Sequence, residues 1–246
     1  MKNFIPNLLT LGNAFCGTLA VIFAVKGDFY ATALLVTFGI AFDFFDGFAA
    51  RLLNVQGELG KQLDSLADMI TSGVVPGIVM MQLLINALDK DAVGYFGVDE
   101  YGQSGSNLPY IGLLITLFAC YRLAKFNIDT RQSDSFIGLP TPATSLFVIS
   151  LPIILEYSDY DIVLSLINNP IFLILVTLVL SVLMVSELPL FSLKFKTFTL
   201  KDNLIKYVFL LISIILLTVF QLVAIPAIII VYILISVLSN FKNKRV

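Results

Sequence analysis

Two aspartates stand in the stretch Asp43-Phe-Phe-Asp46-Gly47-Phe-Ala-Ala50-Arg51. Two more follow, after eight further residues, in Gly60-Lys-Gln-Leu-Asp64-Ser-Leu-Ala-Asp68. The surrounding sequence is strongly apolar. An ionised Asp near the centre of a bilayer costs about 2.5 to 3.5 kcal/mol even on the insertion scale, so such groups pair with cations or line a polar cavity. Four acids this close together therefore indicate a function, and metal binding is the function that suits them best.

The composition places the chain among membrane proteins that cross the bilayer several times. Of its 246 residues, 58% are hydrophobic and only 13% are charged, and the mean hydropathy is +0.95. We predict an all-α, polytopic transmembrane bundle of one domain over residues 1–246, with a catalytic core over about 1–200 and two additional spans in 201–246. The formal net charge of -2 gives no indication of nucleic-acid binding.

Apolar runs bounded by charged residues, Gly or Pro predict eight spans. They cover residues 8–26, 30–53, 61–88, 108–126, 141–156, 168–187, 204–220 and 223–241. The last two result from dividing one long apolar stretch at Gln221–Pro226. If both termini are cytoplasmic, every basic residue except Lys26 and Lys90 lies on that side, as the positive-inside rule requires. The four aspartates then also lie toward the cytoplasm.

Other residue types exclude several chemistries. The chain has no histidine, which rules out histidine nucleophiles and histidine zinc ligands and leaves carboxylates as catalytic groups. Cys16 and Cys120 fall in apolar runs, where we expect inert packing and no disulfide. The segment Met1–Pro6 leads into a long span without a cleavage site, so we expect it to be retained.

The spacing of the acids predicts a metal site. Asp43 and Asp46 are three residues apart and Asp64 and Asp68 four apart, so each pair lies on one face of a helix. An antiparallel hairpin, with its turn in 51–60, would bring both pairs to one level. Four oxygen ligands suit Mg²⁺ or Mn²⁺, and four negative charges match two divalent ions.

Small residues and one cation accompany the acids. Gly47, Ala50 and Gly60 would let a bulky ligand approach, and Arg51 could bind phosphate. Metal ions held by carboxylates commonly serve phosphoryl transfer. Each feature also has a simpler explanation, since small residues usually pack helices together and a lone Arg usually anchors a helix at the interface. A single Asp would more often join helices or relay ions, but four at this spacing favour catalysis.

The spacing D-x2-D-G-x2-A-R-x8-G-x3-D-x3-D, from Asp43 to Asp68, resembles the signature of the CDP-alcohol phosphatidyltransferase family, with every position filled. The resemblance implies a homodimeric membrane enzyme that transfers a phosphatidyl group from a CDP-linked lipid to an alcohol, releases CMP and uses divalent metal. It implies that Asp43, Asp46 and Asp64 are metal ligands and that Asp68 is a further ligand or the general base. It also implies contacts with the CDP-lipid for Asn7, Thr10, Gly47, Ala50, Arg51, Gly60 and Ser65.

Further segments resemble the phosphatidylserine synthase branch of that family, namely Ile5–Asn13, Arg122–Asn127, Phe136–Ala143 and Leu183–Ser186. The implied donor is CDP-diacylglycerol and the implied acceptor is L-serine, whose carboxylate would need a cationic partner. Candidate acceptor residues are Arg122, Lys125, Asn127, Arg131, Gly138 and Thr141. Their cations also satisfy the positive-inside rule, and Gly138–Pro142 also suits the start of a helix.

The expected reaction is attack by the serine hydroxyl on the lipid-side phosphorus, with Asp68 accepting the proton and CMP leaving. Direct displacement is favoured, and an aspartyl intermediate stays open. Two alternatives stay open as well. One is a sibling enzyme that uses glycerol 3-phosphate or inositol phosphate. The other is a cation or proton-coupled transporter, for which inverted repeats and scattered acids would be typical, whereas here the acids lie in one hairpin.

Overall fold

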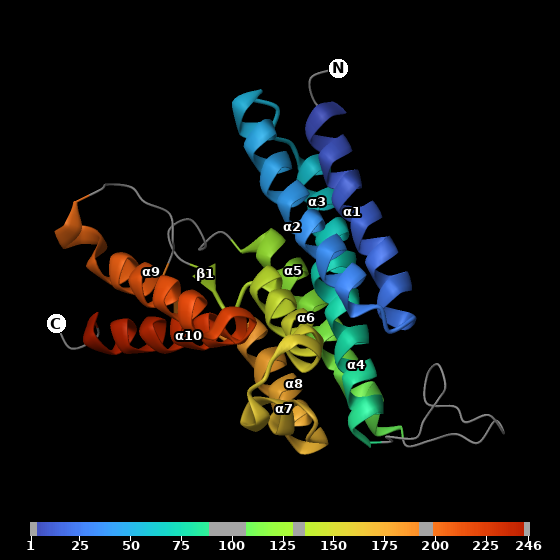
Figure 1. The fold of residues 1–246 in the computed structure, drawn as a ribbon. Coiled ribbons are helices and arrows are strands. Elements are labelled where there is room, and N and C mark those ends of the chain that lie inside the picture. Colours follow the sequence, from blue (N-terminus) through green and yellow to red (C-terminus); the bar gives the residue numbers. More distant parts are fainter. Residues whose placement is uncertain (1–3, 89–106, 130–135, 192–198, 244–246) are drawn as a thin grey trace.

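A computed structural model describes residues 4–88, 107–129, 136–191 and 199–243. As predicted, the described chain is all-α, apart from one pair of two-residue strands (Figure 1). Its elements are α1 (Phe4–Val25), α2 (Phe29–Leu52), α3 (Glu58–Asp68), η1 (Met69–Val74), α4 (Val75–Leu88), η3 (Leu108–Leu113), α5 (Leu114–Ile128), β1 (Phe136–Ile137), α6 (Thr141–Tyr157), α7 (Asp161–Ile167), α8 (Pro170–Val185), β2 (Pro189–Leu190), α9 (Leu200–Phe220), η4 (Gln221–Val223) and α10 (Ala224–Asn243).

Helix α4 forms the centre of the molecule. It is apolar on all sides and packs against α1, α6, α8 and η3, so most of its side chains are buried. Close packing is possible because Gly112 of η3 lies against the backbone of Met81, where a Cβ on the glycine would come within 2.6 Å of the Met81 nitrogen. The acidic hairpin is thereby joined to the most buried helical stretch among the candidate membrane spans.

The predicted helix over 61–88 contains a π-helical turn that the sequence pattern did not reveal. Between α3 and α4, η1 makes wider turns, and the Val75 N–H bonds to the Ile70 carbonyl five residues earlier. Pro76 follows directly and has no N–H to continue an α-helical ladder. π turns inside helices often occur at functional sites. This turn begins immediately after Asp68.

The predicted count of eight spans is not met. Within the described residues, five helical stretches are long and apolar enough to cross a membrane, and six if α7 and α8, bent by 74° at their junction, count as one. Every predicted segment does contain a helix. The count differs because α6 has only 17 residues and because residues 203–240 form one continuous apolar stretch. The side of the membrane on which the termini lie stays a prediction.

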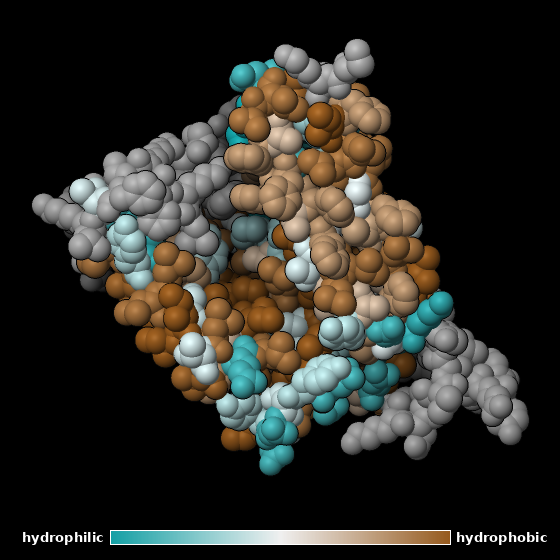
Figure 2. Space-filling model, turned by 45° about the horizontal axis from the view of Figure 1, so that its top comes forward, coloured by the Kyte–Doolittle hydropathy of each residue, from teal (hydrophilic) through white to brown (hydrophobic). Residues whose placement is uncertain are grey.

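The C-terminal hairpin, α9 and α10, is set apart from the N-terminal helices. The chain reverses at η4, where Gln221 has a φ of 49°, which confirms the predicted division of the last apolar stretch. In Figure 1 this hairpin runs crosswise to α1 and α2. Figure 2 shows apolar side chains over both parts, with a recess between them.

Candidate active site

Three of the four aspartates converge where α2 meets α3. Oxygen atoms of Asp43, Asp64 and Asp68 all lie within 4.8 Å of one another, and the three side chains are partly buried. The predicted helical hairpin therefore forms, with α2 ending at Leu52 and α3 beginning at Glu58. The resulting group, the acid triad, is held by backbone hydrogen bonds of two helices rather than by a loop.

Asn13 on α1 orients the triad. Its Nδ2 donates a hydrogen bond of 3.1 Å to Asp68 Oδ1, and its Oδ1 accepts one of 2.7 Å from Thr71 Oγ1. Thr71 lies in η1 and can approach because its neighbours are glycines: a Cβ on Gly17 would lie 2.3 Å from Thr71 Oγ1, and one on Gly39 2.7 Å from Thr71 Cγ2. The π turn thus supplies a second layer of contacts behind the acids.

Asp46 lies outside the triad, although the spacing places it on the same face as Asp43. It is buried, and its Oδ2 accepts a hydrogen bond from Thr10 Oγ1, which is also within 3.1 Å of the Pro6 carbonyl. The first helix therefore contacts both acidic pairs, Asp46 through Thr10 and Asp68 through Asn13. That Asp46 also binds metal stays a prediction.

A cavity of about 330 Å³, the α1–α3 cavity, opens beside the triad. It is lined by Pro6, Asn7, Thr10, Asp46, Gly47, Ala50, Arg51, Val55, Gln56, Gly57, Gly60, Lys61 and Asp64. The lining includes every predicted CDP-lipid contact except Ser65. The two cations in this lining, Arg51 and Lys61, suit a ligand that carries phosphate, and its two carboxylates, Asp46 and Asp64, suit a metal ion bound with that ligand.

Gly47 and Gly60 leave this cavity open. A Cβ on Gly47 would come no closer than 3.8 Å to the Arg51 guanidinium, and one on Gly60 no closer than 3.7 Å to Asn7 Oδ1. These are ordinary contact distances, unlike those at Gly17 and Gly39. Packing within the described protein therefore does not require glycine at 47 or 60, which favours the ligand explanation of these two residues over the packing one.

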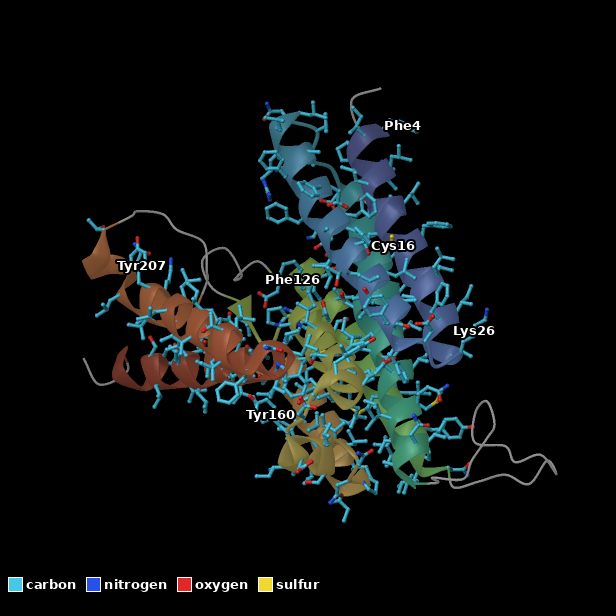
Figure 3. All side chains as sticks on the ribbon, viewed as in Figure 1. Phe4, Cys16, Lys26, Phe126, Tyr160 and Tyr207 are labelled. Carbon is cyan, nitrogen blue, oxygen red and sulfur yellow. The ribbon has the colours of Figure 1, made fainter. Side chains whose placement is uncertain are left out.

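Arg122 approaches the triad from α5. It is only 7% exposed, it interacts electrostatically with Asp68, and its guanidinium lies 5.9 Å from the centre of the Phe126 ring. Its Nε is buried and has no hydrogen-bond partner within the described residues. Figure 3 labels Phe126 on α5. A buried guanidinium with an unused donor is suited to bind an anionic group of a ligand.

The end of α5 also contacts α3. Asn127 Nδ2 donates a hydrogen bond of 2.9 Å to Ser65 Oγ, and the Asn127 carbonyl accepts one from Lys61 Nζ. Ser65 therefore faces α5 and not the α1–α3 cavity. Lys61 belongs to both regions, since it lines the cavity and also binds α5.

The remaining predicted acceptor residues within the described chain have surroundings of their own, away from Ser65 and Lys61. Lys125 pairs with Glu187 at 2.5 Å. Gly138 has a φ of 75° and its N–H bonds to the Leu188 carbonyl, while Thr141 begins α6 with a buried Oγ1 that has no hydrogen-bond partner in the described part of the chain. Arg131 lies outside the described residues.

The triad has the composition of a divalent-metal site. All its donors are carboxylate oxygens, which Mg²⁺ and Mn²⁺ prefer. Asp64 Oδ1 is buried and has no hydrogen-bond partner among the residues described. An unpartnered buried carboxylate oxygen beside two other carboxylates is costly without a cation. Asp43, Asp64 and Asp68 could therefore hold such an ion.

Sequence reasoning gave no role to several residues that the structure places in or behind the site, among them Asn13, which orients Asp68. Gln56, Gly57 and Lys61 line the cavity, and Thr71 supports Asn13. Gln56 and Gly57 lie in the turn between α2 and α3, and Lys61 lies in the first turn of α3, so their closeness in sequence to the aspartates was a signal that they could contact a bound ligand. Thr71 gave no such signal, because its role depends on the π turn.

Comparison with known proteins agrees with this geometry. The sequence profile of the CDP-alcohol phosphatidyltransferase family matches residues 3–239. The chain is 34% identical over 190 residues to CDP-diacylglycerol–serine O-phosphatidyltransferase of Bacillus subtilis, covering 76% of this chain and 89% of that protein. The enzyme of the same name from Helicobacter pylori is 35% identical over 58% of this chain and 55% of its own length. Archaetidylserine synthase of Methanothermobacter thermautotrophicus is 29% identical, over 63% of this chain and 60% of that protein. The chain belongs to the CDP-alcohol phosphatidyltransferase family.

Proposed function

We propose that this chain is a phosphatidylserine synthase, which transfers the phosphatidyl group of CDP-diacylglycerol to the hydroxyl of L-serine and releases CMP. The observation that carries the proposal is that the acid triad adjoins both the α1–α3 cavity, which Asp64 lines, and the buried Arg122, which interacts with Asp68. The two substrates of a transfer reaction need such a division. The names of the relatives support serine as the acceptor.

The α1–α3 cavity would hold the donor head group. Arg51 and Lys61 offer positive charge to the diphosphate, and Gly47 and Gly60 leave room for it. The many exposed apolar side chains of α1 and α2 would face the acyl chains. The basic residues near this end support a cytoplasmic active site through the positive-inside rule. A homodimer is expected from the family resemblance alone.

Arg122 would hold the carboxylate of serine. Because serine is short, a carboxylate at Arg122 would keep the hydroxyl close to Asp68, with which Arg122 interacts. Asn13 fixes the orientation of the Asp68 carboxylate. Asp68 would accept the hydroxyl proton as the new oxygen–phosphorus bond forms and the bond to the CMP oxygen breaks. The chain's own residues thus position both substrates and move the proton.

Metal would assist this reaction at the acid triad. Mg²⁺ or Mn²⁺ held by Asp43, Asp64 and Asp68 would neutralise charge on the diphosphate. The predicted second ion would need Asp46 as well. Neither the number nor the identity of the ions is needed for the roles given to Arg51, Lys61, Asn13 and Arg122.

The proposal is tested by CMP release from CDP-diacylglycerol in detergent with Mn²⁺ or Mg²⁺. Serine, glycerol 3-phosphate, inositol phosphate or no acceptor is added, and Asp68→Asn is the inactive control. Release that depends on serine and is lost in Asp68→Asn supports the proposal. Release with another acceptor instead would replace serine but keep the family's chemistry, and a lack of release with every acceptor would contradict the proposed reaction.

A further inference from the structure

Three aromatic rings join the C-terminal hairpin to the strand pair. Tyr232 of α10 lies 4.9 Å from Phe191 and 5.7 Å from Phe209 of α9, measured between ring centres. Tyr232 is 9% exposed, and its hydroxyl donates a hydrogen bond of 2.9 Å to the Phe191 carbonyl. A second side chain of α10, Asn240, donates to the Pro189 carbonyl. Helix α10 therefore binds the backbone on both sides of Leu190.

The strand pair transmits this attachment to α6. Strand β2 pairs antiparallel with β1, so that Ile137 faces Pro189. The next N–H groups, of Gly138 and Leu139, bond to the carbonyls of Leu188 and Leu183. A Cβ on Gly138 would lie 2.5 Å from the Met184 carbonyl, so the two segments are tightly fitted. Thr141, with its unpartnered buried hydroxyl, follows directly.

Tyr232 also lies within electrostatic range of the cation of the acceptor side. Arg122 and Tyr232 interact electrostatically although they lie 110 residues apart in the sequence. The phenol hydrogen is directed to the Phe191 carbonyl. Arg122 is itself buried, and its Nε has no hydrogen-bond partner in the described part of the chain.

From these contacts we infer that α10 is part of the acceptor-binding site and that Tyr232 is its positioning residue, which holds the strand pair that leads to Thr141. The inference rests on the proposed function in so far as it assigns an acceptor to this side of the site, whereas the contacts themselves do not depend on that function. It gives the last two helices a role other than anchoring in the membrane. Their sequence offers only hydrophobicity, so this role was not predicted.

The test compares Tyr232→Phe with wild type in steady-state kinetics, with the acceptor varied at saturating CDP-diacylglycerol. The substitution keeps the ring cluster and removes one hydrogen bond and one oxygen. We expect the acceptor KM to rise about fivefold, with kcat and the donor KM unchanged, as the loss of a single hydrogen bond predicts. Asn240→Ala should shift the acceptor KM in the same direction. Tyr160→Phe is the matched control, since Tyr160 packs on Phe220 of α9, 6.1 Å away, and not on the strand pair.

Hydrogen–deuterium exchange adds a measurement that does not require turnover. In Tyr232→Phe, peptides that contain 137–141 should exchange faster, while peptides that contain 43–68 should not change. An unchanged acceptor KM together with unchanged exchange at 137–141 would overturn the inference, as would equal losses in kcat and both KM values. If wild type turns over with an acceptor other than serine, that acceptor is used. If it turns over with none, the proposed function fails, while exchange at 137–141 still decides whether α10 braces this segment.

Discussion

The proposed donor side and the proposed acceptor side of this site are built in different ways. The donor side, the α1–α3 cavity, draws all its lining residues from positions 6–64. The acceptor side combines Arg122 of α5, Thr141 at the start of α6, the strand pair and Tyr232 of α10. The first is a local helical hairpin closed by α1, and the second is assembled from segments distributed over the rest of the chain.

This difference explains which roles a sequence pattern can reveal. Helical periodicity fixes the relative positions of side chains three or four residues apart, so the spacing of the acids alone predicts which of them share a helix face. No such rule relates residue 122 to residue 232. Under the proposed function the two sides also differ in how a substitution should act, because the triad would serve both substrates whereas each side would serve one.

The largest effect should come from the triad. Asp64→Asn removes one charge from the carboxylates and should lower CMP release about a thousandfold with any acceptor, because loss of a ligand exceeds the roughly 10- to 100-fold effect of outer contacts. Mn²⁺ binding, measured by calorimetry, should weaken in parallel. Asp28→Asn is the matched control, since Asp28 caps the far end of α2 and Asn also caps helices. Unchanged activity in Asp64→Asn would contradict the metal assignment.

A crossed pair of substitutions separates the two sides. Arg51→Ala should raise the donor KM and Arg122→Ala the acceptor KM, each about 10- to 100-fold, as expected for lost hydrogen bonds to a charged group. Donor KM is measured as the mole fraction of CDP-diacylglycerol in mixed micelles. Arg122→Lys should recover part of the acceptor affinity. If both substitutions raise the same KM, the division into two sides is wrong.

A smaller effect is expected behind the triad. Thr71→Val keeps the shape of the side chain but removes the hydrogen bond to Asn13 Oδ1, so the orientation of Asp68 should loosen and kcat should fall about tenfold. Thr18→Val is the control, because Thr18 is exposed on α1 and bonds only to its own helix at Ala14. Equal activity of the two variants would show that the π turn does not support the chemistry.

The smallest effect should come from the pair at the end of α5. Lys125 and Glu187 are 29% and 59% exposed, and exposed ion pairs contribute about 0 to 1 kcal/mol. Glu187→Gln should therefore change the acceptor KM less than about fivefold and the melting temperature only slightly. A larger rise in KM would show that this pair orders the acceptor side.

Most of the fold was predictable, and the predicted CDP-lipid residues other than Ser65 do line the α1–α3 cavity. Each predicted span contains a helix, and the reversal at Gln221–Pro226 is confirmed, because long apolar runs have few alternatives in a membrane. The number of spans was not predictable, since neither the length of α6 nor the bend between α7 and α8 follows from hydropathy. Ser65 is the clearest difference within the site. It was expected at the CDP-lipid but bonds to Asn127, because its direction depends on where α5 packs.

The sequence by itself determined the family, the membrane bundle and the pairing of the acids, since these depend on composition and on spacing within one or two helical turns. Only the tertiary structure decided that Asp46 turns to Thr10, that a π turn brings Thr71 behind Asn13 and Asp68, and that α10 binds the backbone beside the strand pair. The physical reason is that each of these contacts joins segments whose separation is set by helix packing, and packing depends on the shapes of all the neighbouring side chains at once.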